Sequence, residues 1–191
     1  FDKKEITHQY SIDFEEFHRI YYDINEGLWV KIRDGLIDKE YLRKHRFYDT
    51  FRYFGIDDEA LAMYFEEHFL DQILKFNYLV EGTESILEYL KEKGYVMHII
   101  SNGFQEVTER KCALSGISSY FSSITSADSI GVRKPNSKIF EYSLDIAKAK
   151  KEESILIGDD LIADVKGAQD FGLDVIFFDS LKEDKNEEGL K

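Results

Sequence analysis

The sequence predicts an α/β protein: a doubly wound parallel sheet that carries an added bundle of helices. Short apolar runs at 96–100, 155–157 and 175–178 lack polar alternation, which is typical of strands covered on both faces of a parallel sheet. Segments with helical periodicity separate these runs, as in βαβ units. Residues 1–78 contain helical patterns without a strand signal, which predicts a helical bundle.

The helical part is expected to contain three amphipathic helices, each beginning after a carboxylate or hydroxyl that can serve as N-cap. Two of them are expected to end at a glycine, and the third extends to the last apolar residue of its pattern. Their aromatic stripes are interpreted as bundle core. The expected ranges are Asp13 to Gly27, Asp38 to Gly55 and Asp58 to Leu74, with Ser11 and Asp57 as alternative caps. We therefore expect two parts, a helical insertion or appendage at 1–78 and an α/β core at 79–191.

Elements of the core follow one another as helix and strand in turn. The expected elements are a helix at 83–93, a strand at 96–100, a helix at 105–114, a strand at 122–126, a loop at 131–136, a helix from Asn136 or Ser137, a strand at 155–157, a helix from about Asp160 to Gly172, and a strand at 175–178.

Three carboxylates follow the strand predicted at 155–157. Asp159, Asp160 and Asp164 come directly after Gly158, at the carboxyl end of a parallel strand, where open α/β sheets bind ligands. Clustered carboxylates suit Mg²⁺, which takes one or two of them plus water and substrate phosphate. The alternative is a helix N-terminus carrying acids that the helix dipole favours, and for Asp160 alone the two interpretations are about equally supported.

Two further polar segments fall at the same predicted sheet edge. Ser101, Asn102 and Gly103 lie between a strand and a helix, where a hydroxyl, an amide and backbone N–H groups can hold phosphate oxygens, although the same tripeptide is an ordinary turn. Lys134 precedes the only proline, which restricts its backbone, and it could neutralise a transferring phosphoryl group or be a solvated loop lysine. The order of hydroxyl, lysine and acids at successive strand ends favours the functional interpretation.

Composition narrows the functional classes. The net charge of −13 argues against binding a nucleic-acid backbone, and no apolar run approaches the length of a membrane span. Cys112 is the only cysteine, so no disulfide forms within the chain and a reducing, cytoplasmic location is expected. A monomer or a homodimer is compatible with the sequence.

Residues 79–179 resemble the haloacid dehalogenase-like (HAD) hydrolase superfamily. Ile99 to Gly103 is similar to its second motif, Gly131 to Pro135 to its third, and Gly158 to Asp160 with Asp164 to its fourth. The resemblance implies a Rossmann-like core with a helical cap at 1–78, Ser101 on the phosphate, Lys134 bridging nucleophile and phosphate, and Asp159 on Mg²⁺. Asp164 would then join the metal shell directly or through water, or hold Lys134.

Within the superfamily, the sequence segments 27–29, 101–104 and 134–140 look most like those of bacterial pyrimidine 5′-nucleotidases. One departure concerns the nucleophile, which the family carries in an Asp-x-Asp-x-Thr motif on its first core strand. The sequence contains no such string. That strand lies in the family between those ending at Ser101 and Gly158, so we expect upstream residues of the natural protein to supply it.

The resulting hypothesis is a Mg²⁺-dependent phosphatase that acts on a small phosphorylated metabolite, such as a nucleoside 5′-monophosphate, through an aspartyl-phosphate. A phosphomutase or a haloacid dehalogenase of the same fold is an alternative, and so is a non-catalytic binding protein if the nucleophile is truly absent. In the cap, Trp29, Arg33 and Arg46 could meet the substrate, although a packed or solvated position in the bundle is favoured for each.

Overall fold

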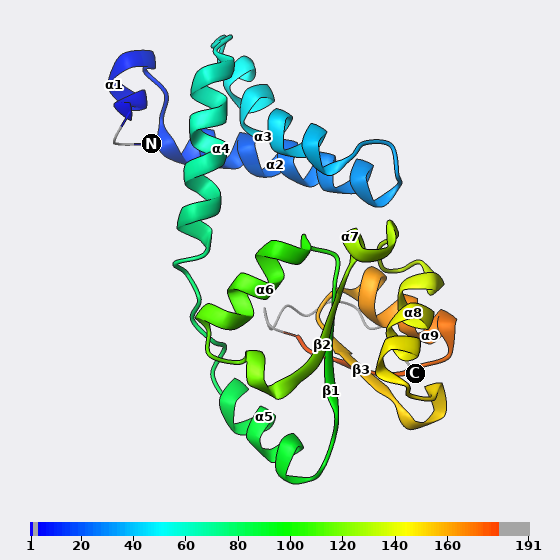
Figure 1. Ribbon diagram of the computed structural model, residues 1–191. Coiled ribbons are helices and arrows are strands. Elements are labelled where there is room, and N and C mark those ends of the chain that lie inside the picture. The colour runs from blue at the N-terminus through cyan, green and yellow to red at the C-terminus, as the bar shows by residue number, and fades with distance from the viewer. Residues whose placement is uncertain (2–3, 180–191) are drawn as a thin grey trace. The chain divides into compact units, whose positions relative to one another are not determined.

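The computed structural model describes residue 1 and residues 4–179 (Figure 1). The chain divides into two units, Phe1–Tyr78 and Leu79–Lys191. The first contains helices only among its described residues, and the second combines helices with parallel strands, so the predicted α/β class is confirmed. None of the helices in the described ranges combines the length and apolar composition that crossing a bilayer would require.

The first unit is a helical bundle. Its helices are α1 (Ile6–Tyr10), α2 (Phe14–Arg33), α3 (Lys39–Tyr53) and α4 (Glu59–Ile73). Figure 1 shows α2 and α3 side by side, and α4 packs against α3. Buried aromatic residues of α2 and α3, including Phe17, Phe47 and Phe51, form its core, as the aromatic stripes predict.

Three of these helices begin where the sequence indicates. The side chains of Asp13, Asp38 and Asp58 each accept a hydrogen bond from a backbone N–H three residues later. The expected end of the first helix at Gly27 is wrong, because α2 continues to Arg33. Leu28 and Ile32 are buried on its apolar face beyond the glycine, and this burial outweighs the low helix propensity of one glycine.

The second unit alternates helices and strands. The helices are α5 (Thr83–Glu92), α6 (Gln105–Leu114), α7 (Ala127–Ile130), α8 (Ser137–Ala147) and α9 (Gly167–Phe171), and single turns lie at η2 (Ser118–Tyr120) and η3 (Lys151–Glu153). The strands are β1 (Met97–Ser101), β2 (Phe121–Ser126), β3 (Ile155–Gly158) and β4 (Asp174–Phe177). A wider π-helical turn, η4 (Leu161–Lys166), precedes α9.

The four strands form two parallel pairs, β1 with β2 and β3 with β4. In the described part of the chain no strand joins β1 to β3, so each of these strands keeps one edge without a strand partner. These are the two strands between which the sequence analysis expects a further strand.

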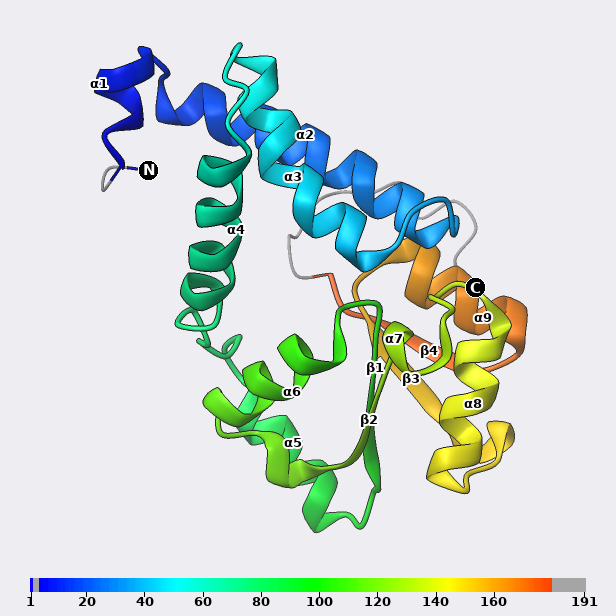
Figure 2. The ribbon, with the colours of Figure 1, turned by 45° about the horizontal axis from the view of Figure 1, so that its top comes forward.

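Burial of the strands differs from the sequence prediction. Leu156 packs with Phe140 of α8 and Ala168 of α9 in one apolar cluster, and Figure 2 shows α8 and α9 together beside β3 and β4. On the opposite face, Ile155 and Ile157 are 53% and 52% exposed. The expected coverage of this strand on both faces is therefore wrong for the described residues, because no described element covers that second face.

Candidate active site

The first strand delivers Ser101 to its carboxyl end. The Ser101 hydroxyl oxygen lies 3.0 Å from the backbone N–H of Gly103, which donates to it, and 3.3 Å from the Thr108 hydroxyl of α6. A Cβ on Gly103 would lie 3.1 Å from this oxygen, so glycine allows the backbone to approach it closely. The predicted serine is thus held beside the N-terminus of α6, whose backbone N–H groups favour an anion.

Lys134 is 9% exposed and reaches back across the end of β1. Its Nζ donates to the Ile100 carbonyl oxygen at 3.1 Å and to Asp164 Oδ1 at 2.5 Å. The Asn102 side chain contacts the main chain of the same lysine, because Asn102 Oδ1 accepts from Lys134 N at 2.7 Å and Nδ2 donates to Lys134 O at 3.0 Å. The Lys134–Pro135 peptide bond is cis.

The three aspartates have three different environments. Asp164 is buried in η4, where Oδ1 pairs with Lys134 and Oδ2 accepts from the Asp160 backbone N–H at 3.2 Å. Asp160 caps η4, since its Oδ1 accepts from the N–H groups of Ile162 and Ala163 at 2.8 Å. Asp159 is exposed and has no side-chain partner in the described ranges.

Metal binding by these aspartates remains a prediction. No group of three His, Cys, Asp or Glu side chains within residue 1 and residues 4–179 is arranged to hold a metal ion. Asp164 is engaged by an ammonium and Asp160 by a helix end, whereas Asp159 is open to a ligand. Mg²⁺ needs only one or two carboxylates beside water and phosphate, so an ion held through Asp159 is compatible with this donor set.

Two glycines permit the close packing of this region. A Cβ on Gly158 would lie 2.5 Å from Cβ, Cγ and Oδ2 of Asp164, and a Cβ on Gly167 would lie 2.9 Å from the Pro135 backbone. Sequence reasoning did not assign either close approach. Both glycines lie close to the acidic residues in the sequence, which could have suggested a special role. The residues that an added Cβ would strike, Asp164 and Pro135, lie on other structural elements, so the sequence alone does not identify them.

Arg133, next to Lys134, is largely buried. Its Nη2 lies 3.7 Å from Asp128 Oδ1, and its Nε has no hydrogen-bond partner within the described ranges. Burial lowers the pKa of this guanidinium, and the nearby Asp128 carboxylate opposes that effect. The side chain next to Lys134 is therefore also largely withdrawn from solvent, 13% exposed beside Asp128 of α7.

Of the cap residues considered for substrate contact, Arg46 is the best defined. It is 4% exposed, and its guanidinium binds both carboxylate oxygens of Glu66, whose side chain is also buried. This is the packed position that the sequence analysis favours for Arg46. Arg33 Nε lies 3.7 Å from Asp34 Oδ1, and the Trp29 side chain is half-buried.

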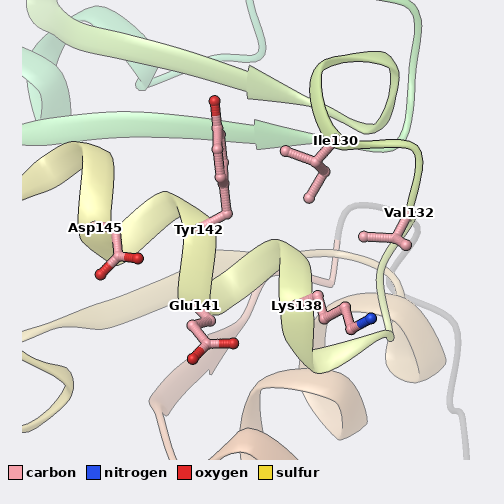
Figure 3. Close-up of a pocket in the computed structure, with 6 residues that line it drawn as sticks. All are labelled: Ile130, Val132, Lys138, Glu141, Tyr142 and Asp145. Carbon is pink, nitrogen blue, oxygen red and sulfur yellow. The ribbon is translucent and has the colours of Figure 1, made fainter.

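A surface hollow of about 300 Å³ lies elsewhere on the second unit, beside α8. Figure 3 shows that its lining side chains do not converge on one point: Tyr142 extends to one side of the helix and Glu141 and Asp145 to another. Ser101, Lys134 and the three aspartates at 159, 160 and 164 do not line this hollow, so we do not assign it as the active site.

Comparisons with known proteins show which family the chain resembles. Residues 35–178 match the profile described as haloacid dehalogenase-like hydrolase. The chain is 27% identical over 169 residues to Pyrimidine 5′-nucleotidase PynA of Streptococcus pneumoniae, covering 87% of this chain and 70% of that protein. It is 28% identical over 167 residues to Pyrimidine 5′-nucleotidase YjjG of Escherichia coli, covering 86% and 72%.

A solved structure shares the fold. The HAD-hydrolase YfnB of Bacillus subtilis, solved bound to magnesium, superposes with a TM-score of 0.81 at 24% identity, covering 94% of this chain and 80% of that one. The resemblance to HAD hydrolases, with pyrimidine 5′-nucleotidases among the relatives, is confirmed.

Proposed function

The chain belongs to the haloacid dehalogenase-like hydrolase family, and we propose that it forms the cap and most of the core of a Mg²⁺-dependent phosphatase for a small phosphorylated metabolite. The observation that carries the proposal is the position of Lys134. The Lys134 ammonium contacts the Ile100 carbonyl, next to Ser101 at the end of β1, and also Asp164, which follows β3, so it links the carboxyl ends of these two strands. Pairing between Lys134 and Asp164 is one of the roles that the family resemblance implies for Asp164.

The chemistry follows from these groups. The Ser101 hydroxyl and the N–H groups before α6 would bind phosphate oxygens. Lys134 Nζ uses two of its three N–H bonds within the protein, and the third would donate to the transferring phosphoryl group. Asp159 would hold Mg²⁺, which when bound offsets the negative charge of the phosphate oxygens.

The attacking carboxylate would come from a strand between β1 and β3, whose facing edges have no partner among the described strands. Attack of this carboxylate on phosphorus would form an aspartyl-phosphate and break the ester P–O bond, and the second Asp of the Asp-x-Asp-x-Thr motif would give its proton to the leaving alcohol. The same Asp would take back a proton from the water that attacks in the next step. Water then attacks the same phosphorus, which releases inorganic phosphate and restores the carboxylate. The first unit would act as the cap that excludes water during the first step.

The substrate proposed first is a nucleoside 5′-monophosphate, because two relatives carry the name pyrimidine 5′-nucleotidase. The test uses the full-length natural protein, stripped with EDTA and assayed before and after Mg²⁺ is restored. Nucleotides, sugar phosphates and a 2-haloacid form the substrate panel. We expect phosphate release that depends on Mg²⁺ and is highest with nucleoside monophosphates.

Variants make the test specific to the site. Lys134→Ala should lower kcat by about 10²- to 10³-fold, the loss typical of removing one stabilising donor. Asp159→Asn should raise the Mg²⁺ concentration needed for activity, while Asp170→Asn, which alters a surface pair with Lys166, is the matched control. Halide release without a metal requirement would identify a dehalogenase instead, and no turnover of any substrate would favour a binding protein.

A further inference from the structure

The Asn102 side chain makes a two-point contact with a residue 32 positions away. Its carbonyl oxygen accepts from the Lys134 backbone N–H at 2.7 Å, and its NH₂ group donates to the Lys134 carbonyl oxygen at 3.0 Å. A side-chain amide has the same donor and acceptor as a peptide group, so this contact resembles one rung of a β-ladder. It ties the segment after β1 to the loop before α8.

The contact fixes the backbone from which the lysine side chain extends. A lysine side chain has four rotatable bonds, so many conformations are open to it and ordering it costs conformational entropy. The position of its Nζ therefore depends on where its backbone is held. Lys134 is held at both ends, by Asn102 at the main chain and by Asp164 and the Ile100 carbonyl at the ammonium.

Asn102 was predicted from sequence to bind phosphate. In the structure each polar atom of its side chain already bonds to Lys134. We propose that Asn102 is a positioning residue, whose side chain acts on phosphoryl transfer through Lys134 and not through its own contact with the phosphate. This inference rests on the proposed phosphatase function.

A double-mutant cycle on the full-length protein separates the two roles. Asn102→Ala and Lys134→Ala are made singly and together, and kcat and KM are measured with a phosphate ester in Mg²⁺. A misplacement of about 1 Å at a catalytic group lowers the rate by about 10²-fold, so we expect a loss of that order in kcat for Asn102→Ala. In the Lys134→Ala background the same change should cost less than about threefold, because its target is gone.

The cycle does not depend on turnover alone. The dissociation constant of inorganic phosphate in Mg²⁺ is measured by calorimetry for all four proteins, which covers a Lys134 variant without detectable activity. There too, Asn102→Ala should weaken binding in the unaltered background and change it less than about threefold in the lysine variant. Thermal unfolding checks folding, and Asn102→Ser replaces the alanine variant if that one does not fold.

Asn136 provides a matched control. Its Oδ1 accepts from the Lys138 backbone N–H at 3.0 Å and caps α8, two residues beyond Lys134. Asn136→Ala also removes an asparagine–backbone bond near this loop, so it should lower the midpoint of thermal unfolding and leave kcat nearly unchanged. A merely structural asparagine at position 102 would behave in the same way.

The outcomes are distinct. Equal losses for Asn102→Ala with and without Lys134, in an otherwise active enzyme, would overturn the inference and assign Asn102 to the phosphate. An Asn102→Ala enzyme that keeps its kcat would overturn it as well. An unaltered protein that neither hydrolyses phosphate esters nor binds phosphate would instead overturn the proposed function, and this inference with it.

Discussion

Replacing Gly158 with alanine should damage the site by displacing Asp164. The added Cβ would lie 2.5 Å from three side-chain atoms of Asp164, whereas ordinary contact begins at 3.4 Å, so a shift of about 0.9 Å is needed. One of the three atoms is Asp164 Cβ, which does not move when the carboxylate rotates. The backbone of β3 or of η4 must therefore shift.

The size of the effect follows from this shift. Lys134 Nζ and Asp164 Oδ1 are 2.5 Å apart, and a displacement of this size along their axis would take them to the limit of hydrogen bonding. Overpacking of this kind destabilises a protein by about 1–3 kcal/mol. A misplacement near 1 Å also lowers activity by about 10²-fold. We expect both effects in Gly158→Ala.

Urea denaturation followed by circular dichroism measures the first effect, and kcat/KM for a phosphate ester measures the second. Gly27→Ala is the control, because nothing lies within 4 Å of its Cβ position inside α2. That substitution should raise stability by about 0.5–1 kcal/mol and leave kcat/KM unchanged. A Gly158→Ala protein with the denaturation midpoint and activity of the unaltered protein would refute the reasoning.

Three further predictions concern buried groups. Glu66→Gln should destabilise the first unit by about 3 kcal/mol, since it leaves the buried Arg46 charge unneutralised. The double variant Glu66→Leu with Arg46→Met should cost less, and the urea midpoints of these two variants and of the unaltered protein decide this. Burial raises the pKa of Tyr21 to about 12, partly opposed by Arg46, so absorbance titration against Tyr21→Phe should find a late-ionising tyrosine. The stabilisation that comes from keeping Tyr21 protonated in the folded state should be complete below pH 10, the ordinary tyrosine pKa, and should fall as the pH rises towards 12. Burial lowers the pKa of His98, so stability should fall as pH drops below 6.5 and the unfolded chain takes up a proton first. A His98→Gln variant that shows the same pH dependence would contradict this last prediction.

Local features of the fold could be predicted from the sequence. Asp13, Asp38, Asp58 and Asn136 cap helices as expected, because a cap involves atoms only two or three residues apart. The end of α2 was mispredicted, because burial of residues beyond Gly27 depends on neighbouring helices and not on the glycine.

The candidate site residues could be named from the sequence, and their roles in catalysis stay a prediction. Ser101, Lys134 and the aspartates were identified from their places after predicted strands. The structure shows which contact each acid makes. Asp164 pairs with Lys134, 30 residues away, and Asp160 caps the turn that follows it. The family resemblance left two roles open for Asp164, the metal or Lys134, and two for Asp160, because spacing along the chain does not record the direction of each side chain.

The sequence by itself determined the order of helices and strands, the helix caps and the family, because periodicity, capping and motif spacing are properties of neighbouring residues. Only the tertiary structure decided which face of β3 is covered, which carboxylate is left open to a ligand, and that Asn102 contacts Lys134. Each of these results from segments that are distant in the chain and meet in space, where excluded volume and hydrogen-bond geometry select one partner among several chemically suitable ones.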